Sequence, residues 1–470
     1  MDLAILHPVP GPAWAARAYR DEVVLLAACL HRGGHAVSLT VVTPAESADL
    51  AAAVAEAHPD LVLMFAEGLA ADAAARTAGA VASALGVPLV VFGPYARRCP
   101  DACLSLPGAE AVAVAHAPQV VPAYLEARAA RVDSIRAAGM WVTCETGVMR
   151  NPVPPPPDSL ADEPLPLRRL YGSEQTLDGA GLAPIVAARG REGGEVSAPA
   201  GPSAGPAGPP DAAPMPGPTP WPVLHRPLEA VLREMQDLAI DQLDLGGWRI
   251  GNTRWASEAD WLAGFAGRYP REVGLPIRTT LHPADVTAET AGLLARAGAE
   301  EVRLPLGSAS HLIRTEAIGM DASPEQVQAA VAHLRKAGVR SAVRVQVGAP
   351  YETEVTLEET VDLLRRIDPD RVEARLHWPE PGSKAEAVAR EHGWLAPDPS
   401  AAYLAGEPAV RLPSLPAEAI REARDLLPYR VHRPGLVPFL RLARRVRIPW
   451  KGTAWEWLVR PLLAPPVRKG

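Results

Sequence analysis

The sequence predicts an α/β protein in which an N-terminal flavodoxin/Rossmann-like doubly wound parallel sheet is followed by a partial (β/α)6 TIM-type barrel. Short apolar runs alternate with amphipathic helices through residues 1–130, and helical crossovers of this kind bury both faces of a parallel sheet. After about residue 222 the rhythm of strand and capped helix returns. Residues 131–181, between the two parts, are rich in proline, which forces an extended backbone and removes hydrogen-bond donors. We expect them to form a surface connector.

Length and composition exclude several classes of protein. A chain of 470 residues that is 48% hydrophobic has enough apolar material for two or three domains with buried cores. A net charge of −7 gives no case for nucleic-acid binding. The first residues lack the pattern of a signal peptide and no uncharged apolar stretch reaches ~18 residues, so we expect no leader and no spanning helix. Four cysteines indicate a reducing compartment, and we predict a cytoplasmic protein.

The first predicted domain, residues 1–130, contains five parallel strands with helices between them. Each strand is a short apolar run, and the helices show the periodicity of a face that is buried on a sheet. The expected strands are Leu3–His7, Val37–Val42, Leu61–Phe65, Pro88–Gly93 and Ala111–His116, and the expected helices are Glu22–His31, Glu46–Ala57, Ala70–Leu85 and Val120–Ala130.

The second predicted domain, residues 182–395, contains six strand–helix units, fewer than the eight of a closed barrel. Its helices are marked by their caps: Ser323 precedes Pro324 at a helix start, and Thr356 with Glu359 has the spacing of a capping box. The expected strands are Pro184–Ala188, Gln242–Leu245, Pro276–Thr280, Glu301–Pro305, Ser341–Gly348 and Arg371–Trp378.

Two segments differ in composition from the rest. Residues 191–222 consist mainly of glycine, proline, alanine and serine, which offer too little apolar bulk to offset the entropy of ordering, so we predict a disordered loop. Residues 396–470 are predicted to be a helical, basic tail, in which arginines interleave with aromatic residues after a helix at Pro416–Leu427. That pattern suits a partner's groove or an anionic membrane surface, and also a helix that packs on the barrel.

Three landmarks of the second domain occur in a fixed order: Ala188-Arg189-Gly190, then Gly348-Ala349-Pro350 with Glu352-Thr353, then Pro379-Glu380-Pro381-Gly382. In this order they resemble the radical S-adenosylmethionine (SAM) proteins that carry an N-terminal cobalamin-binding domain. The resemblance covers roughly residues 1–425. It implies a cobalamin-binding-like Rossmann domain in front of a radical SAM-like barrel.

The chain departs from this family at the cluster-binding loop. There the family has three cysteines, spaced CxxxCxxC, that hold a 4Fe–4S cluster. Here those positions fall on Arg191, Glu195 and Ala198, and no cysteine follows Cys144. A guanidinium cannot ligate iron, and a carboxylate is a hard ligand that is poorly matched to a sulfur-rich cluster. We therefore predict no 4Fe–4S cluster, no other metal site and no catalytic residue.

Other catalytic signatures are also missing from the sequence. A CxxxC pair occurs at Cys99 and Cys103, but the third cysteine position is Leu106. The pair follows the fourth strand of the first domain, so we interpret both cysteines as incidental. The sequence contains no G-x-S-x-G, P-loop or H-E-x-x-H motif.

The resemblance also implies where cofactors would bind. Gly93, in the loop after the fourth strand, matches a position near cobalamin, and five residues after barrel strands match the SAM pocket: Gly246, Gly247, Ser308, Gly348 and Pro350. Two acidic positions of that pocket are occupied by Trp248 and Gly307. Glycine and proline also serve turns at strand ends, so these residues have a purely structural interpretation as well.

These observations predict a degenerate member of the family that has lost its cluster ligands. Its expected role is that of a non-catalytic partner of another protein, such as an active paralogue, or of a module that binds cobalamin or another ligand. The alternative is an enzyme, either a methyltransferase- or cyclase-like enzyme of the cobalamin-dependent radical SAM type or one whose chemistry needs no cluster. Cobalamin and SAM are the candidate cofactors, because a fold of this kind does not by itself select a ligand.

Overall fold

The structure is a computed structural model that describes residues 1–15, 17–43, 58–130, 136–178, 180–190, 221–242 and 244–445. Contacts divide the chain into two units. Of the described residues, unit 1 contains those in 1–190, 221–249 and 380–383, and unit 2 contains those in 250–379 and 384–445. The domain boundaries at residues 130, 181 and 395 stay predictions.

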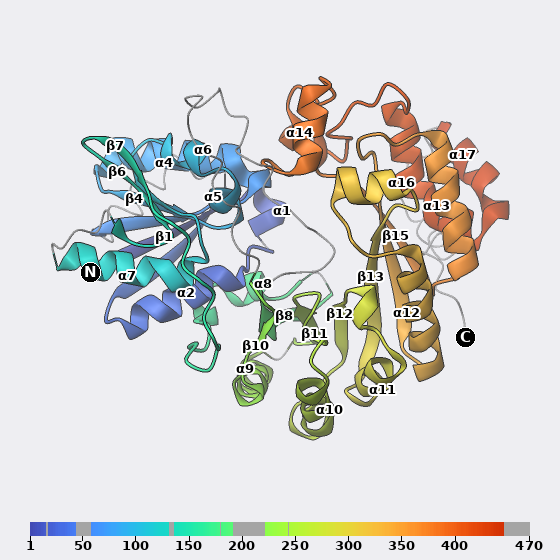
Figure 1. Ribbon diagram of the computed structural model, residues 1–470, viewed down its shortest axis with the longest axis horizontal. Helices are drawn as coiled ribbons and strands as arrows, with labels where there is room; N and C mark the ends of the chain where they lie inside the picture. The colour runs from blue at the N-terminus through green and yellow to red at the C-terminus, as the bar shows by residue number, and fades with distance from the viewer. Residues whose placement is uncertain are drawn as a thin grey trace. The chain divides into compact units, whose positions relative to one another are not determined.

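Unit 1 is built on a seven-stranded sheet with the order β2-β1-β3-β4-β5-β6-β7 (Figure 1). The first five strands in this order run parallel, and β6 and β7 add an antiparallel hairpin at the edge. The doubly wound parallel sheet predicted from the sequence is confirmed, and the hairpin comes from the predicted connector. The strands are β1 (Asp2–Pro8), β2 (Ala36–Val42), β3 (Leu61–Phe65), β4 (Leu89–Phe92), β5 (Ala109–Ala113), β6 (Met140–Cys144) and β7 (Gly147–Arg150).

Both faces of this sheet are buried, which explains why its strands are continuous apolar runs. Alternate residues of β1 point to opposite sides, so that Leu3 and Ile5 belong to one core and Ala4 and Leu6 to the other. The predicted helix Glu46–Ala57 lies outside the described residues. The first core is covered by α2 (Asp21–Arg32) and α7 (Ala117–Ala129), and the second by α4 (Ala71–Leu85), α5 (Pro94–Arg98) and α6 (Pro100–Leu104).

The chain then passes through the connector, which contains η3 (Arg168–Leu170) and α8 (Ser173–Thr176), and enters β8 (Leu182–Val186). Beyond β8, the short strand β9 (Ala188–Arg189) pairs antiparallel with β10 (Leu224–His225). The segments on either side of the predicted disordered loop are therefore neighbours. Residues 191–220 of that loop lie outside the described residues.

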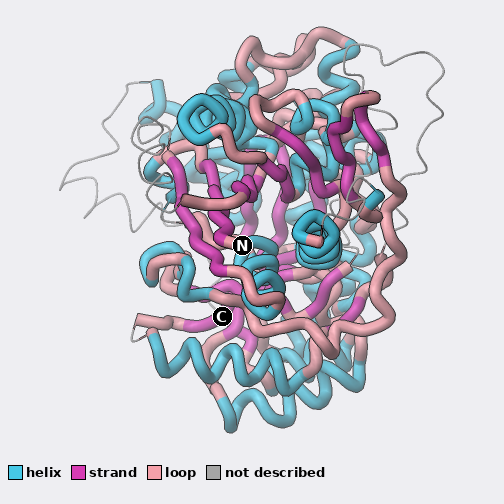
Figure 2. The backbone as a smooth tube through the Cα atoms, turned by 90° about the vertical axis from the view of Figure 1, so that its left-hand side faces the viewer, coloured by secondary structure: helices cyan, strands magenta, loops and turns pink. Residues whose placement is uncertain are grey.

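A second sheet has the order β15-β14-β13-β12-β11-β8, and a helix follows each strand. This series of six units confirms the predicted partial barrel, and Figure 2 shows the same alternation of strands and helices along the backbone. The strands after β8 are β11 (Gly247–Gly251), β12 (Ile277–Thr280), β13 (Ala299–Gly307), β14 (Arg340–Val347) and β15 (Arg371–Leu376). The helices are α9 (Leu228–Asp241), α10 (Ala259–Glu272), α11 (Ala288–Arg296), α12 (Pro324–Ala337), α13 (Glu354–Ile367) and α14 (Lys384–Glu391).

The prediction of the second barrel strand is wrong. The expected strand was Gln242–Leu245, but β11 begins at Gly247. Gln242 instead ends α9, where its N–H donates to the carbonyl of Leu238 at 3.0 Å. The buried side chains of β11 are Trp248 and Ile250. Arg249 between them and the glycines at both ends of the strand weaken the apolar pattern that marks a strand.

One of the two predicted caps is confirmed and the other is wrong. Ser323 caps α12, because its Oγ accepts the N–H of Gln326 at 3.2 Å. Helix α13 is capped by Thr353, whose Oγ1 accepts the N–H of Thr356 at 3.2 Å. Thr356 is therefore already inside the helix, and the box that we expected between Thr356 and Glu359 does not start it.

In the part of the chain that the structure describes, three α-helices follow the barrel: α15 (Pro399–Leu404), α16 (Ala417–His432) and α17 (Val437–Arg445). Helix α16, which confirms the helix predicted at Pro416–Leu427, packs against β15 and α13. No helix in the described ranges has the length and apolar character needed to cross a membrane. The basic and aromatic run from residue 446 onward lies outside the described residues.

Candidate functional site

The strand order of the first sheet defines one place where a ligand would bind. Strand β1 lies between β2 and β3, so the sheet winds outward from it in both directions. In open parallel sheets the crevice beyond the carboxyl ends of the strands at such a switch point is the usual ligand site. His7 lies at the end of β1, and Glu67 follows β3. We call the carboxyl ends of β1, β3 and β4, with the loops after them, the switch-point edge.

His7 is the most unusual group at the switch-point edge. Its side chain is fully buried, and its Nδ1 lies 2.8 Å from the hydroxyl of Tyr171. Burial, assisted by the charge of Arg20, lowers the pKa of His7 to about 3, so the imidazole is neutral. No described residue is a hydrogen-bond partner of its Nε2. Buried polar atoms are rarely left without a partner, so this nitrogen marks a place that a ligand or water would satisfy.

Other side chains of unit 1 pack around His7 at the switch-point edge. Arg20 donates from Nη2 to Oε2 of Glu67 at 2.8 Å. Burial would raise the pKa of Glu67, but the charge and hydrogen bonds of Arg20 outweigh it and lower the pKa. Tyr171 contacts His7 and Tyr19 through its ring. His7 is therefore packed against the rings of Phe65 and Tyr171.

Gly93, one of the predicted cofactor-binding residues, lies at the switch-point edge between β4 and α5. Its φ is +108°, and a Cβ there would lie 2.8 Å from the carbonyl oxygen of Ala66 and 2.9 Å from the ring of Phe65. The same carbonyl accepts the N–H of Tyr95 at 3.0 Å. Packing of this loop on β3 is therefore sufficient to require glycine, with or without a ligand.

Three further predicted residues are brought to one edge of the second sheet. Ser308 follows β13, and Gly348 and Pro350 follow β14, its neighbour. All three are buried. Ser308 Oγ accepts the N–H of Ser310 at 3.2 Å. Gly348 has a φ of +84°, and a Cβ there would lie 2.9 Å from Ile420 in α16.

Gly246 and Gly247 lie elsewhere, because Gly246 precedes β11 and Gly247 is its first residue, so neither follows the strand. Gly246 donates its N–H to the carbonyl of Gly181 at 2.9 Å. The residue that follows β11 is Asn252, whose Oδ1 accepts the N–H of Arg254 at 2.8 Å. Trp248, expected where the family has a glutamate, is instead a fully buried residue inside the strand.

Glu352 is a site residue that we did not single out for this role, although it belongs to a landmark of the family resemblance. Its side chain is 1% exposed and accepts the backbone N–H of Gly348. Burial raises the pKa of Glu352 to about 8, against the opposing effect of the N–H groups of Gly348 and Ala349. The signal available in the sequence was its place immediately after a barrel strand, where functional residues gather.

A buried chain of ion pairs holds the two strands that flank the predicted loop. Arg189 of β9 donates to Glu163 at 2.6 and 2.8 Å and to Asp21 at 2.7 Å. Arg226, just after β10, donates to Glu234 at 2.7 Å and to the carbonyl of Val186 at 2.8 Å. We call the four residues Arg189, Glu163, Arg226 and Glu234, with Asp21 and Arg168, the ionic network.

The ion pairs of the network join in one row that runs from Asp21 to Arg168. Arg226 lies 3.3 Å from Glu163, and Arg168 donates to Glu234 at 2.7 Å, so three arginines alternate with three carboxylates. Arg226 is 1% exposed and Glu234 is 4% exposed. Arginine is suited to such sites because its planar fork pairs with two oxygens and stays charged. The network therefore ties β9 and Arg226, just after β10, to α2 and α9 through buried ion pairs.

The cysteines do not provide a cluster site. All four belong to unit 1: Cys29 on α2, Cys99 and Cys103 beside and on α6, and Cys144 on β6. Burial raises the pKa of Cys29 to about 11 and raises that of Cys103 further, which disfavours the thiolate that binds metal. No three His, Cys, Asp or Glu side chains converge on a metal position within the described ranges. These donors do not fit a 4Fe–4S cluster.

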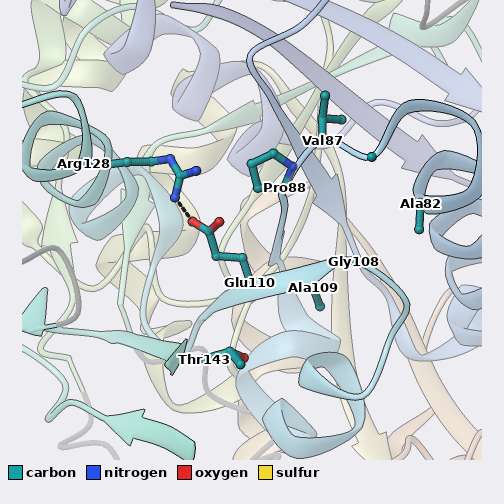
Figure 3. Close-up of a pocket in the computed structure, with 9 residues that line it drawn as sticks. Ala82, Val87, Pro88, Gly108, Ala109, Glu110, Arg128 and Thr143 are labelled. Atoms are coloured by element: carbon teal, nitrogen blue, oxygen red, sulfur yellow. Dashed lines mark hydrogen bonds and ion pairs between the residues drawn. The ribbon is translucent and has the colours of Figure 1, made fainter. Parts of the chain in front are cut away.

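An open pocket of about 620 Å³ lies at the opposite end of the first sheet (Figure 3). It is lined by the segments that precede β4 and β5, including Pro88 and Gly108. In Figure 3, Arg128 reaches towards Glu110, and the two form an ion pair. Because ligands of doubly wound sheets bind at the carboxyl ends, we do not assign the cofactor to this pocket.

Solved structures share the two-part fold of this chain. The radical SAM methyltransferase TsrM from Kitasatospora setae, with a tryptophan substrate and a SAM analogue bound, matches with a TM-score of 0.62 at 16% identity over 84% of this chain and 76% of TsrM. TsrM with cobalamin and a [4Fe–4S] cluster bound gives the same TM-score. The cobalamin-dependent SAM radical enzyme OxsB, with aqua-cobalamin and SAM bound, gives 0.57 at 11% identity over 82% of this chain and 54% of OxsB.

At these identities the likeness establishes the fold: this chain has the architecture of the cobalamin-dependent radical SAM enzymes, as the sequence landmarks indicated. No protein-family model matches the sequence, and no curated protein matches it in sequence.

Proposed function

We propose that this protein is a non-catalytic relative of the cobalamin-dependent radical SAM enzymes, which uses their scaffold to bind a ligand. The observation that carries the proposal is the absence of any cysteine after Cys144, which includes the whole barrel sequence. Reductive cleavage of SAM needs a cluster held by three thiolates with one iron left open. The ionic network supports the proposal, because it gives the exit from β8 a cluster-independent anchor.

Cobalamin is the ligand that we propose for the switch-point edge. TsrM and OxsB have been solved with cobalamin, and the unpartnered Nε2 of His7 supplies a polar group for a ligand at this edge. The loops after β1 and β4, with His7 and Gly93, would contact the cofactor. For SAM the support is weaker, since Gly307 stands where the family has a glutamate. Ser308, Gly348 and Pro350 would line its pocket.

Titration with hydroxocobalamin tests this proposal. We expect a saturable change in the absorption spectrum of the corrinoid, and weaker binding by His7→Gln. The control is His35→Gln, which changes a histidine at the amino end of β2, away from the switch-point edge. Binding that is equal in both variants, or absent from the native chain, would contradict the assignment of cobalamin. Formation of 5′-deoxyadenosine from SAM by reduced protein would instead favour the enzyme alternative.

A non-catalytic protein of this kind would act by binding another protein. We propose an active paralogue, with its three cysteines intact, as the protein partner, and the cytoplasm as the compartment, since four free cysteines suit a reducing environment. A stable complex of the two purified proteins in size-exclusion chromatography supports this, and independent elution at micromolar concentrations opposes it.

A further inference from the structure

One face of the second sheet carries charged side chains, whereas the interior of a strand–helix barrel is normally filled by branched apolar ones. Along β14, Val343, Val345 and Val347 are at most 1% exposed, and helix α12 packs against this strand. Arg344 and Gln346 alternate with them and so point to the other side. We call this other side of the sheet the charged face. It is formed by Glu301, Arg303, Arg344, Arg371, Glu373 and Arg375.

Register and ion pairs show that these six residues form one surface. Arg344 lies directly opposite Glu373 in the pairing of β14 with β15. Arg303 of β13 donates to both oxygens of Glu373 at 2.9 Å, so it reaches across β14. Arg371 bonds Glu301 and Glu373, each at 2.6 Å. All six residues belong to unit 2.

The charged face has more positive than negative groups, since four arginines share two glutamates. Both carboxylates are engaged by Arg303 and Arg371. Arg344 is 3.2 Å and Arg375 3.9 Å from the same glutamate, Glu373. Burial, with the charges of Arg375 and Arg303, lowers the pKa of Arg344 to about 10. The guanidinium groups therefore repel each other, and an anion placed between them would relieve this repulsion.

A second, independent feature lies at the carboxyl end of the same face. His377 follows β15 at the alternate position after Glu373 and Arg375, and its Nδ1 lies 2.6 Å from Oε1 of Gln346. Its side chain is 4% exposed. Its Nε2 meets no hydrogen-bond partner in the part of the chain that the structure describes. Because Nδ1 donates to Oε1 of Gln346, Nε2 is an acceptor, and it would be satisfied by a hydroxyl group of a polar ligand at this end.

We infer that the charged face is a binding site for a small anion with phosphate or carboxylate groups, held by Arg344 and Arg375 and bounded by His377 and Gln346 at the carboxyl ends of the strands. Arginine forks match both kinds of anion, and the half-exposed side chain of Arg375 gives access to the site. The inference goes beyond the proposed function and does not depend on cobalamin, because every residue of the site lies in unit 2.

Isothermal titration of the full chain with inorganic pyrophosphate and with citrate, at constant ionic strength, tests the inference. We expect saturable binding of one or both anions, weakened at least about tenfold by Arg375→Gln and by Arg344→Gln, since each removes a charge-assisted hydrogen bond. Arg296→Gln, which removes an equal charge from the exposed end of α11, should leave binding unchanged. The basic tail is the same in all variants and cannot produce the difference.

Two outcomes would overturn the inference: no binding of either anion at millimolar concentration, or equal binding by the native chain, Arg375→Gln and Arg344→Gln. Thermal unfolding without anion checks that the variants fold, and the side chain of Arg375 is 59% exposed, so its removal disturbs little packing. The hydroxocobalamin titration should be unaffected by Arg375→Gln. A failure of the cobalamin proposal is thereby distinguished from a failure of this one.

Discussion

Burial of Glu352 in the loop after β14 favours its neutral form, because a carboxylate loses its hydration there. The N–H groups of Gly348 and Ala349 favour the charged form, but burial dominates and raises the pKa to about 8. In the unfolded chain the same carboxyl ionises near 4.5, its ordinary value. The contribution of Glu352 to stability is therefore complete below pH 4.5 and is lost as pH rises from 4.5 to 8.

We predict that Glu352→Gln stabilises the protein at neutral pH. An amide stays neutral, and its oxygen still accepts the N–H of Gly348. The free energy of unfolding should rise by about 1–3 kcal/mol at pH 7 and by much less at pH 5. Urea unfolding at the two pH values measures the change, and Glu359→Gln, at an exposed position of α13, is the control. A loss of stability at pH 7 would show that the loop requires the charge.

The role of a single residue could be predicted from the sequence only where its near neighbours in the chain determine that role. Gly93 and Gly348 were singled out by the family resemblance, and the structure shows that a positive φ and close packing restrict both positions to glycine whether or not a ligand binds. His7 and Glu352 are unusual because they are buried, which only the assembled sheets determine. The charged face was visible as alternating charges in β15, but the sequence does not reveal that β13 and β14 place matching charges beside them.

At the scale of elements, the pair β9–β10 and the ionic network determine how the barrel begins. They bring residues 189 and 224 into register, so a short connection between them is sufficient. We predict that deletion of residues 194–217 lowers the thermal midpoint by no more than a few degrees, because loop closure depends only weakly on loop length. Differential scanning calorimetry measures this, and unfolding of the deleted chain would show that the segment is structural.

The deletion is compared with Arg226→Met. This substitution removes one member of the ionic network and leaves the length of the chain unchanged. Arg226 is 1% exposed, and its loss leaves Glu163 and Glu234 with one partner fewer in a buried site. Breaking a buried ion pair costs about 3–5 kcal/mol. We therefore expect Arg226→Met to lower stability far more than the deletion does, and equal effects would show that the network does not anchor β9 and β10.

The ends of helices and strands could be predicted from the sequence where two local signals agree. Ser323 with Pro324 marks the start of α12 in both sequence and structure. Strand β11 was misplaced because its two buried side chains are separated by an arginine and flanked by glycines. The ionic network could not be predicted, since Asp21, Glu163 and Arg226 are far apart in the chain and no local pattern joins them.

For the whole molecule, the fold was predicted from the alternation of strands and helices, together with the order of the landmarks. The structure and its likeness to TsrM and OxsB confirm that prediction. The proposed function depends on three positions in the segment after β9, where the sequence has Arg191, Glu195 and Ala198. The central proposal is therefore chemical: without cysteines at these positions, we propose that the chain binds no 4Fe–4S cluster.

Iron and sulfide analysis after anaerobic reconstitution tests this claim most directly, with TsrM treated in parallel as the positive control. A 4Fe–4S cluster requires about four irons and four sulfides per chain, with absorption that bleaches on reduction. We predict that TsrM reaches these values, while this protein retains far less than one cluster per chain after desalting. About four irons and four sulfides per chain, with absorption that reduction removes, would contradict the account.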